Sequence, residues 1–367
     1  MKAVFVISTL GAGGAERAMS ELARFLAGHG WSIVLASFEA ETSVDFFSLH
    51  PAVRRARLGN PRPARSLAGK LAANLRRALA LRALIAHEKP GVVLSFMETS
   101  NVLALIASAG LQVPVVVAER TDPSQHIAVP KMWRLGRRWL YRRASSVVAQ
   151  TESAADWLRR HCHCAVQVIP NALRELPQPG GGREPLLLSV GRLEAVKGFD
   201  VILHAFARVS RRFPAWRVVI VGDGSLRDEL HALAQELDVA ARVDWLGRRS
   251  DIEHWYARAG LVAQASRFEG FPNVLLEAMG MGAAVISTDC RSGPREIITH
   301  GDNGWLVPVD DVTAMASGMQ ALMANEEARQ SLGRSAMAVR ERFAPASILG
   351  QWERLLMAAR VPGKEPQ

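Results

Sequence analysis

The sequence predicts an α/β protein built from two doubly wound, Rossmann-like domains, and three observations lead to this prediction. Short apolar runs alternate with amphipathic stretches of helical periodicity, which is typical of parallel sheets joined by right-handed crossovers. The alternation stops at the linker-like segment QPGGGREP, residues 178–185, and then begins again. A length of 367 residues suits two domains of ordinary size. We therefore expect an N-terminal domain over residues 1–172 and a second domain over residues 183–345.

Strands are expected where apolar and β-branched residues run together between turn-forming residues. In the first domain these runs are Ala3–Ser8, Trp31–Ser37, Val53–Leu58, Gly91–Phe96, Val113–Ala118 and Ser145–Gln150. In the second they are Leu186–Val190, Arg217–Val221, Arg242–Trp245, Leu261–Ala265 and Ala283–Ser287. The helical stretches are Ala15–His29, Ser66–Glu88, Ser100–Gly110, Arg134–Arg143, Ser153–His161, Val201–Phe213, Ser225–Leu237 and Ser347–Ala359.

Composition places the chain among soluble globular proteins, because 49% of its residues are hydrophobic and 22% are charged. The most apolar window, Val102–Ala118, is interrupted by polar residues, so we expect no transmembrane helix. The apolar run at Met1–Ser8 is too short for a signal peptide and is interpreted as a strand. The odd number of cysteines, three, argues against a disulfide framework and indicates a reducing cytoplasm. The His and Cys residues of the HCHC run at 161–164 are too crowded to bind one metal ion together, so no metal is expected there.

The positive charge is concentrated in the first half of the chain. Residues 1–170 contain 22 Lys and Arg against 11 Asp and Glu, whereas the remaining residues contain 23 and 24. Arginines alternate with Trp133, Trp139 and Tyr141 in one short helix, a pattern suited to an anionic membrane surface. A merely solvated basic face is the alternative. No nucleic-acid-binding signature accompanies the charge, so no nucleic-acid partner is expected.

The stretch Ser266–Thr288 has the features of an anion site at the start of a helix. Pro272 stands where a helix is expected to begin, after a loop that contains Gly270 and Phe271. The backbone N–H groups of the next three residues would be unpaired in the first turn, and unpaired donors together with the helix dipole favour an anion. These residues are Asn273, Val274 and Leu275.

Two carboxylates flank this anion site. Glu269 lies in the loop before the helix, and Glu277 lies about one turn inside it. Acidic side chains repel a phosphate unless they bind something else, and sugar hydroxyls are suitable partners. The stretch therefore predicts a nucleotide-sugar site.

The loop SVGRLEAVKG, residues 189–198, supplies the opposite charge. It follows a predicted strand and contains Arg192 and Lys197, which can clamp a diphosphate whose charge grows as it leaves.

The spacing of Glu269 and Glu277 resembles the E-x7-E signature of the family 4 (group 1) retaining glycosyltransferases. The loop with Arg192 and Lys197 likewise matches that family's G-R-L-x-x-x-K-G pattern. The resemblance implies the GT-B fold, in which two Rossmann-like domains face each other across a cleft. It also implies that residues 346–360 form a helix that crosses back to the N-terminal domain.

The same resemblance implies roles for individual residues. Arg192 and Lys197 would bind the donor's phosphates, so that neither a metal nor another cofactor is needed. Glu269 would bind the hydroxyls of the transferred sugar beside the backbone of Gly270 and Phe271, and Glu277 would bind the ribose. Farther along, Gly222 in VGDG would form the turn that approaches the donor, and Gly247 and Arg248 would contact the base.

The first domain contributes a glycine loop and three charged residues. Gly13 and Gly14 follow the first strand, but Glu16 replaces the last glycine of a dinucleotide fingerprint, so a nicotinamide site is not expected. In the family the equivalent loop faces the diphosphate and the acceptor. Arg120 stands where many family members have a histidine and cannot act as a base. Glu98 and Glu119 are the acids nearest that point. A double displacement would use one of them as nucleophile, whereas same-face substitution, which we favour, needs neither.

The sequence most resembles the N-acetylgalactosamine transferases that extend lipid-linked oligosaccharides, because of its GGAER opening and its SFMETSN run. This implies transfer of a hexose or N-acetylhexosamine, with UDP expected, to a polyprenyl-diphosphate saccharide or glycolipid in surface polysaccharide or glycan biosynthesis. The enzyme would be cytoplasmic and peripheral on the inner face of the cell membrane. The alternatives are a nucleotide-sugar epimerase of the same fold and a non-catalytic membrane scaffold.

Overall fold

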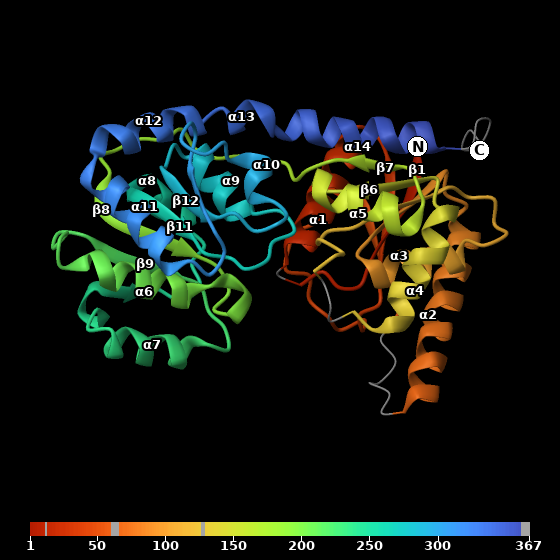
Figure 1. The fold of residues 1–367 in the computed structure, drawn as a ribbon. Coiled ribbons are helices and arrows are strands. Elements are labelled where there is room, and N and C mark those ends of the chain that lie inside the picture. The colour runs from red at the N-terminus through yellow and green to blue at the C-terminus, as the bar shows by residue number, and fades with distance from the viewer. Residues whose placement is uncertain (12, 60–65, 126–128, 361–367) are drawn as a thin grey trace. The chain divides into compact units, whose positions relative to one another are not determined.

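The structure, a computed structural model, describes residues 1–11, 13–59, 66–125 and 129–360. The chain divides into two compact units. Unit 1 holds Met1–Ala172 and Ala346–Gln367, and unit 2 holds Leu173–Pro345 (Figure 1). Each unit is a parallel sheet covered by helices on both faces, so the predicted fold class is confirmed.

In the described part of unit 1, seven strands form one sheet in the order β3-β2-β1-β4-β5-β6-β7. The strands are β1 Lys2–Ile7, β2 Ser32–Ser37, β3 Val53–Arg57, β4 Val92–Phe96, β5 Val115–Ala118, β6 Ser146–Ala149 and β7 Val166–Val168. The helices are α1 Gly14–Gly28, α2 Leu67–Glu88, α3 Glu98–Ala107, α4 Lys131–Leu140, α5 Glu152–Cys162 and α14 Pro345–Ala359, with a 3-10 turn η1 at Tyr141–Arg143.

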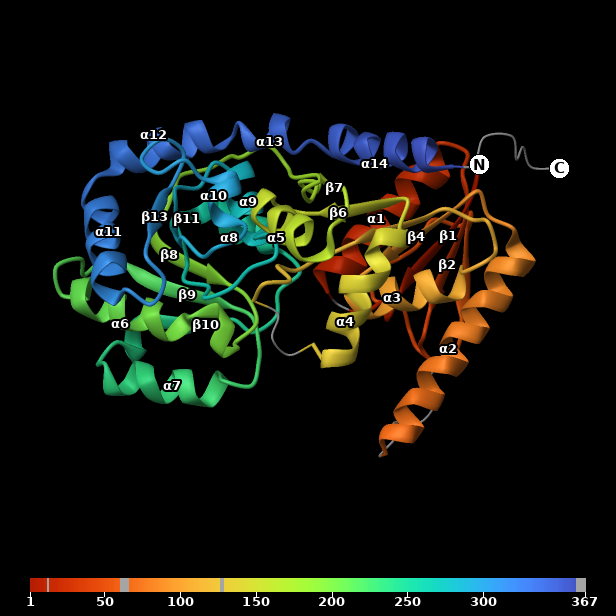
Figure 2. The same ribbon diagram turned by 45° about the vertical axis from the view of Figure 1, so that its right-hand side comes forward.

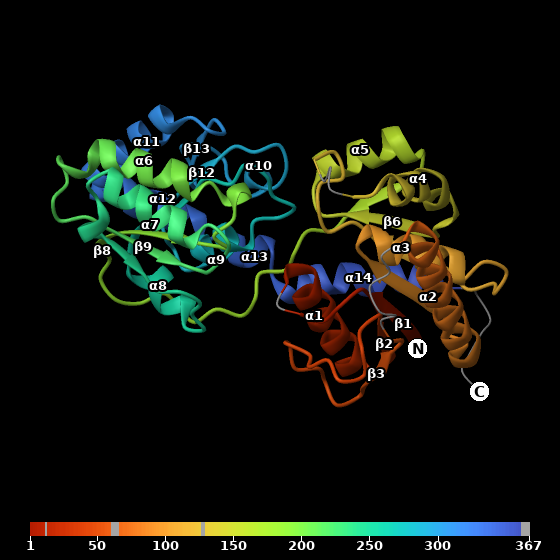
Figure 3. The same ribbon diagram turned by 90° about the horizontal axis from the view of Figure 1, so that it is seen from below.

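Alternating side chains in the strands β1, β2, β4, β5 and β6 point into two different hydrophobic clusters. In β1, for example, Val4 and Val6 face the helices α2 to α5, whereas Phe5 and Ile7 face α1 and α14. The helices α2, α3 and α4 lie side by side on the first face (Figure 2). On the other face α14 runs beside β1 (Figure 3), where Trp352 packs against the ring of Phe96.

In the described part of unit 2, six strands form the order β10-β9-β8-β11-β12-β13. They are β8 Glu184–Val190, β9 Arg217–Val221, β10 Val243–Trp245, β11 Ala259–Gln264, β12 Val285–Thr288 and β13 Trp305–Val307. The helices are α6 Phe199–Ser210, α7 Arg227–Glu236, α8 Ile252–Arg258, α9 Asn273–Gly280, α10 Pro294–Ile297, α11 Val312–Ala324, α12 Glu326–Ala336 and α13 Val339–Arg342, with 3-10 turns η2 Ala195–Lys197 and η3 Ala240–Arg242.

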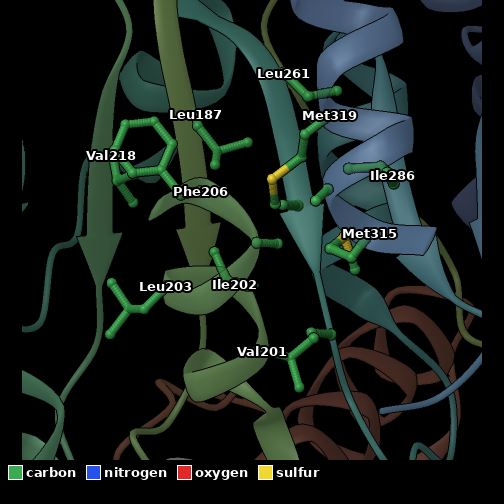
Figure 4. Packing of buried hydrophobic residues seen from close by; sticks show 14 of the residues in the cluster. Leu187, Val201, Ile202, Leu203, Phe206, Val218, Leu261, Ile286, Met315 and Met319 are labelled. Carbon is green, nitrogen blue, oxygen red and sulfur yellow. The ribbon is translucent and has the colours of Figure 1, made fainter. Parts of the chain in front are cut away.

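The larger core of unit 2 lies between the sheet and the helices α6 and α11. Phe206 and Met319 come from these two helices and pack against Leu187 and Leu261 of the central strands (Figure 4). Complete burial of such side chains stabilises the fold by about 1.5–3 kcal/mol each. This packing fixes the carboxyl ends of β8 and β11, where the candidate site begins.

The structure differs from the sequence prediction at short elements. The edge strands β7 and β13 have three residues each, which is too short for a visible alternation. Helices α11 and α12 were not predicted, although Asp311 and Asn325 are side-chain caps at their starts. The linker-like segment ends inside unit 2, because the guanidinium of Arg183 donates to the carbonyl groups of Tyr256, Ala259 and Met281.

Candidate functional site

The centre of the candidate site in unit 2 is an ion pair between Lys197 and Glu269. The strands β8 and β11 are neighbours in the sheet, and the chain leaves them toward opposite edges, which makes this the switch point of the doubly wound fold. Lys197 ends η2 after β8, and Glu269 lies in the loop after β11. Their Nζ and Oε1 atoms are 2.5 Å apart, so the structure brings together two residues that the sequence analysis singled out separately.

Glu269 is held by three donors on the same oxygen. Besides Lys197, the amide Nε2 of Gln264 and the hydroxyl of Ser266 each donate to Oε1 at 2.7 Å. No described residue donates to Oε2, so that oxygen remains an acceptor for a hydroxyl group. Gln264 and Ser266 were not predicted, although both stand at the end of the strand that leads to Glu269.

Arg192 differs from Lys197 in its surroundings. Its side chain is exposed, and no ion pair to it is found among the described residues, whereas the side chain of Lys197 is 22% exposed and paired. The ion pair with Glu269 therefore holds Lys197 in place, whereas Arg192 is available to an incoming anion.

Glycines connect the loops that follow β8, β9 and β10. The N–H of Gly191 donates to the carbonyl of Val221 at 2.9 Å, and the N–H of Gly222 donates to the carbonyl of Gly247 at 2.8 Å. A Cβ on Gly222, where φ is 147°, would lie 1.8 Å from the carbonyl oxygen of Gly191. Only glycine fits this approach. Arg248, directly after Gly247, is exposed.

The start of α9 corrects one part of the sequence prediction. Pro272 is the cap, and the N–H of Asn273 donates to the carbonyl of Phe271 at 3.0 Å, so this N–H is already used. The N–H groups of Val274 and Leu275 lie in the first turn, where no intrahelical acceptor precedes them. Phe271 itself is buried against Phe343, which leaves its backbone as the part that a ligand can meet.

Glu277 has a cationic partner that sequence reasoning missed. Its Oε1 lies 3.1 Å from Nε of Arg174, which also pairs with Glu253. Arg174 comes from the connection into unit 2, far along the chain from Glu277, and no local motif marks it. Glu269 and Glu277 thus have separate cationic partners.

In unit 1, the glycine loop after β1 is covered by an acid. Thr9 donates to Oε1 of Glu16, and a Cβ on Gly13 would lie 2.1 Å from Oε2 of the same side chain. Glu16 is the third residue of α1 and folds back toward its start, as in half of a capping box. A carboxylate therefore lies beside Gly13 at the start of α1.

Glu119 lies at the end of β5 in a fully buried polar network. Its Oε1 accepts a hydrogen bond of 2.6 Å from the hydroxyl of Tyr141, which in turn accepts one of 2.8 Å from the amide of Asn101. Arg137 is 3.5 Å away. Burial raises the pKa of Glu119 to about 7, although the charge of Arg137 opposes the shift. A side chain with no exposed surface cannot touch a substrate in this conformation, which counts against a nucleophilic role for Glu119.

Arg120 is also buried but has different partners from Glu119. Its guanidinium donates to Oδ1 of Asn171 and lies over the ring of Phe96, 4.7 Å from the centroid. Burial lowers the pKa of Arg120 to about 10, so it stays charged at neutral pH. Glu119 and Arg120 are neighbours in the sequence, yet Glu119 pairs with Arg137 and Arg120 with Asn171. Glu98 is the first residue of α3 and is also buried; the residue before it, Met97, has a φ of 75°.

Two further features concern metals and membranes. The HCHC run lies at the end of α5, where Cys162 is buried and His161 is exposed. Among the residues that the structure describes, no group of three or more His, Cys, Asp or Glu side chains is arranged to hold a metal ion. In the same part of the chain, no helix combines the length and the hydrophobicity needed to cross a bilayer.

Two family models match the two halves of the chain. The family model described as glycosyl transferases group 1 matches residues 177–339, and the model described as glycosyltransferase family 4 matches residues 12–174. A relative from Campylobacter jejuni is 30% identical over 97% of this chain and 98% of its own length. Its name is GalNAc-alpha-(1->4)-GalNAc-alpha-(1->3)-diNAcBac-PP-undecaprenol alpha-1,4-N-acetyl-D-galactosaminyltransferase.

Solved structures share the fold of the whole chain. Sucrose-phosphate synthase from Thermosynechococcus elongatus is similar with a TM-score of 0.84 and 21% identity, covering 98% of this chain and 100% of that one. The Anabaena protein HepE, solved in complex with UDP, is similar with a TM-score of 0.80 and 20% identity at the same coverage.

Proposed function

Because the chain belongs to the family 4, group 1 glycosyltransferases, we propose that it transfers a hexose or N-acetylhexosamine from a nucleotide diphosphate sugar to a lipid-linked saccharide or similar glycolipid. UDP is the expected nucleotide. The observation that carries the proposal is the ion pair of Lys197 with Glu269 at the switch point of unit 2, with the exposed Arg192 on the same loop.

In the proposed reaction, the donor's diphosphate leaves with growing negative charge. Arg192 is available to it, and Lys197 can share its three N–H groups between Glu269 and a phosphate oxygen. Together the two cations would supply the charge that a metal ion would otherwise supply. We therefore expect the reaction to need no metal and no other cofactor.

The two carboxylates are proposed to bind hydroxyl groups. Oε2 of Glu269 would accept from the sugar beside Gly270, and Glu277 would accept from the ribose, while the loops with Gly222, Gly247 and Arg248 would bind the rest of the nucleotide. We propose retention of the anomeric configuration through same-face substitution, in which the leaving phosphate takes the acceptor's proton. The buried state of Glu119 supports this choice over a double displacement.

The acceptor side of the proposal is supported by the name of the Campylobacter relative, which acts on an undecaprenol-linked saccharide. It is also supported by the positive charge of residues 1–170. We propose work in polysaccharide or lipid-linked glycan biosynthesis on an anionic membrane surface, at the cytoplasmic face of the cell membrane.

One experiment tests the donor, the acceptor and the stereochemistry together. The protein is incubated with UDP- and GDP-sugars and a membrane lipid extract, release of nucleotide is measured, and the product's anomeric configuration is read from proton coupling constants. Release from UDP-sugars that depends on the extract, with retention, is expected. Preference for GDP-sugars or an inverted product would contradict the proposal, as would loss of activity on adding a chelator.

A further inference from the structure

A pocket of about 410 Å³ lies in unit 1 between α4, α5 and the loop after β5, from which Pro123 and Ser124 contribute to its lining. Its polar lining is dominated by cationic and ionisable basic side chains, namely Lys131, Arg134, Arg137, Arg138 and His161. Among the residues that the structure describes, no aspartate or glutamate lines it.

Three of these cations have no carboxylate partner in the described part of the chain. Among the described residues, no carboxylate forms an ion pair with Lys131, Arg134 or Arg138, and all three are exposed. The two acidic residues of α5, Glu152 and Asp156, each form an ion pair with Arg159. Three unpaired cations on one short helix repel each other unless an anion lies among them, so the pocket favours an anionic ligand.

The back of the pocket is a fixed wall. The guanidinium of Arg137 lies over the ring of Trp157 at 4.9 Å, and Trp157 is stacked on His161 with centroids 4.2 Å apart. Arg137 is buried and paired with Glu119. Burial raises the pKa of the Cys162 thiol, which also lines the pocket, to about 12, so this group adds no negative charge at neutral pH. The wall is therefore preorganised, and the cations at the mouth remain free to bind.

Two apolar side chains beside the cationic mouth of the pocket face solvent. Leu135 lines the pocket and is 57% exposed, and Trp139, one turn farther along α4, is 60% exposed. A free phosphate gains nothing from such side chains, whereas the acyl region of a lipid does. Arg142 stacks on Trp139 at 5.0 Å, which places a cation beside the ring, as at a membrane interface.

From these observations we propose that the pocket between α4 and α5 binds the phosphate headgroup of an anionic phospholipid. Lys131, Arg134 and Arg138 hold the phosphate, and Leu135 and Trp139 enter the boundary of the acyl chains. The inference deepens the proposed function in one respect, because it names the site by which unit 1 would bind the membrane that carries the acceptor.

The test compares two triple variants of the full chain with the same change of charge. The pocket variant is Lys131→Gln, Arg134→Gln and Arg138→Gln, and the control is Lys70→Gln, Arg76→Gln and Arg143→Gln, whose exposed cations lie in the same basic half but outside the pocket. Binding to vesicles of phosphatidylcholine with and without phosphatidylglycerol is measured by sedimentation. Circular dichroism checks that both variants fold.

The pocket variant should weaken binding to the phosphatidylglycerol vesicles about a hundredfold, since each cation at an anionic surface contributes about fivefold and bound phosphate adds directed hydrogen bonds. The control should weaken it less than about fivefold. Equal losses in the two variants would mean diffuse attraction and would overturn the pocket assignment.

A second measurement identifies the ligand. Calorimetry with short-chain phosphatidylglycerol and with inorganic phosphate should show much tighter binding of the lipid, and only in proteins with an intact pocket. Equal affinity for inorganic phosphate, or vesicle binding that requires added polyprenyl diphosphate, would overturn the assignment to a phospholipid. Neither measurement uses the sugar donor, so failure of the transfer reaction and failure of this site can be told apart.

Discussion

Glu119 in unit 1 and Glu269 in unit 2 are similar in sequence position and different in behaviour. Each follows a central strand of a parallel sheet, each accepts a hydrogen bond from a hydroxyl group, and each has a cation beside it. The side chain of Glu119 has no exposed surface, and its pKa is raised to about 7. The side chain of Glu269 is 10% exposed, and all of its donors reach one oxygen. Burial rather than residue type therefore separates a structural carboxylate from a candidate ligand-binding one.

The largest expected effect concerns the cations of unit 2. Lys197→Ala and Arg192→Ala should each lower turnover by about a hundredfold to a thousandfold, because one donor to a developing oxyanion contributes about 3–4 kcal/mol. Steady-state kinetics with the preferred donor measures this. Arg211→Ala, which removes an exposed cation from the same unit, is the control and should keep normal turnover. Near-normal turnover in both site variants would remove Arg192 and Lys197 from the phosphate site.

The next effect concerns the burial of Glu119. The pKa of Glu119 is raised in the folded protein from the ordinary value of 4.5 to about 7, so the folded state binds more protons between about pH 4.5 and pH 7 and loses stability as pH rises through this window. The Glu119→Gln variant has no titratable group at this position. Relative to this variant, the native chain should lose about 3 kcal/mol of unfolding free energy between about pH 5 and pH 8. Urea unfolding at both pH values measures the difference, and a constant difference would show that Glu119 ionises normally.

Gly222 in unit 2 and Gly11 in unit 1 should differ in how much stability is lost when alanine replaces them. Gly222→Ala places a Cβ against a backbone carbonyl at a φ of 147°, whereas a Cβ on Gly11 meets no described atom within 4 Å. We expect Gly222→Ala to lower the free energy of unfolding by about 2–3 kcal/mol and Gly11→Ala to change it by less than about 1 kcal/mol. Thermal or urea unfolding of the two variants tests this. Similar stabilities would show that the loop after β9 can relax.

The smallest expected effect distinguishes the roles of Glu269 and Glu277 in unit 2. Hydrogen bonds to charged groups contribute about 1.5–3 kcal/mol, and Gln keeps the acceptor but loses the charge. Glu277→Gln should weaken binding of UDP itself, measured by calorimetry. Glu269→Gln should leave UDP affinity almost intact and lower turnover. The reverse pattern would mean that the two roles are exchanged.

Much of the candidate site could be predicted from the sequence because it is local. Glu269, Glu277 and the start of α9 lie within one loop and one helix, and Arg192 and Lys197 lie within another loop. Spacing along the chain sets their geometry once the flanking elements are identified. The glycines of the unit 2 turns could be predicted for the same reason, since a close backbone approach admits only glycine.

The tertiary structure decided which of these residues meet and which are buried. Lys197 reaches Glu269 only because β8 and β11 become neighbours in the sheet, and Arg174 reaches Glu277 from a distant segment. In unit 1, Glu119 pairs with Arg137 rather than with the adjacent Arg120.

The sequence by itself determined the alternation of strands and helices, the two-domain fold class and the local motifs. These depend on periodicity and on backbone conformation, which are properties of neighbouring residues. The tertiary structure alone decided the partners, the exposure and the pKa of each charged group. Charge interactions act through space and vary with burial, so the sequence around Glu119 or Glu269 does not contain them.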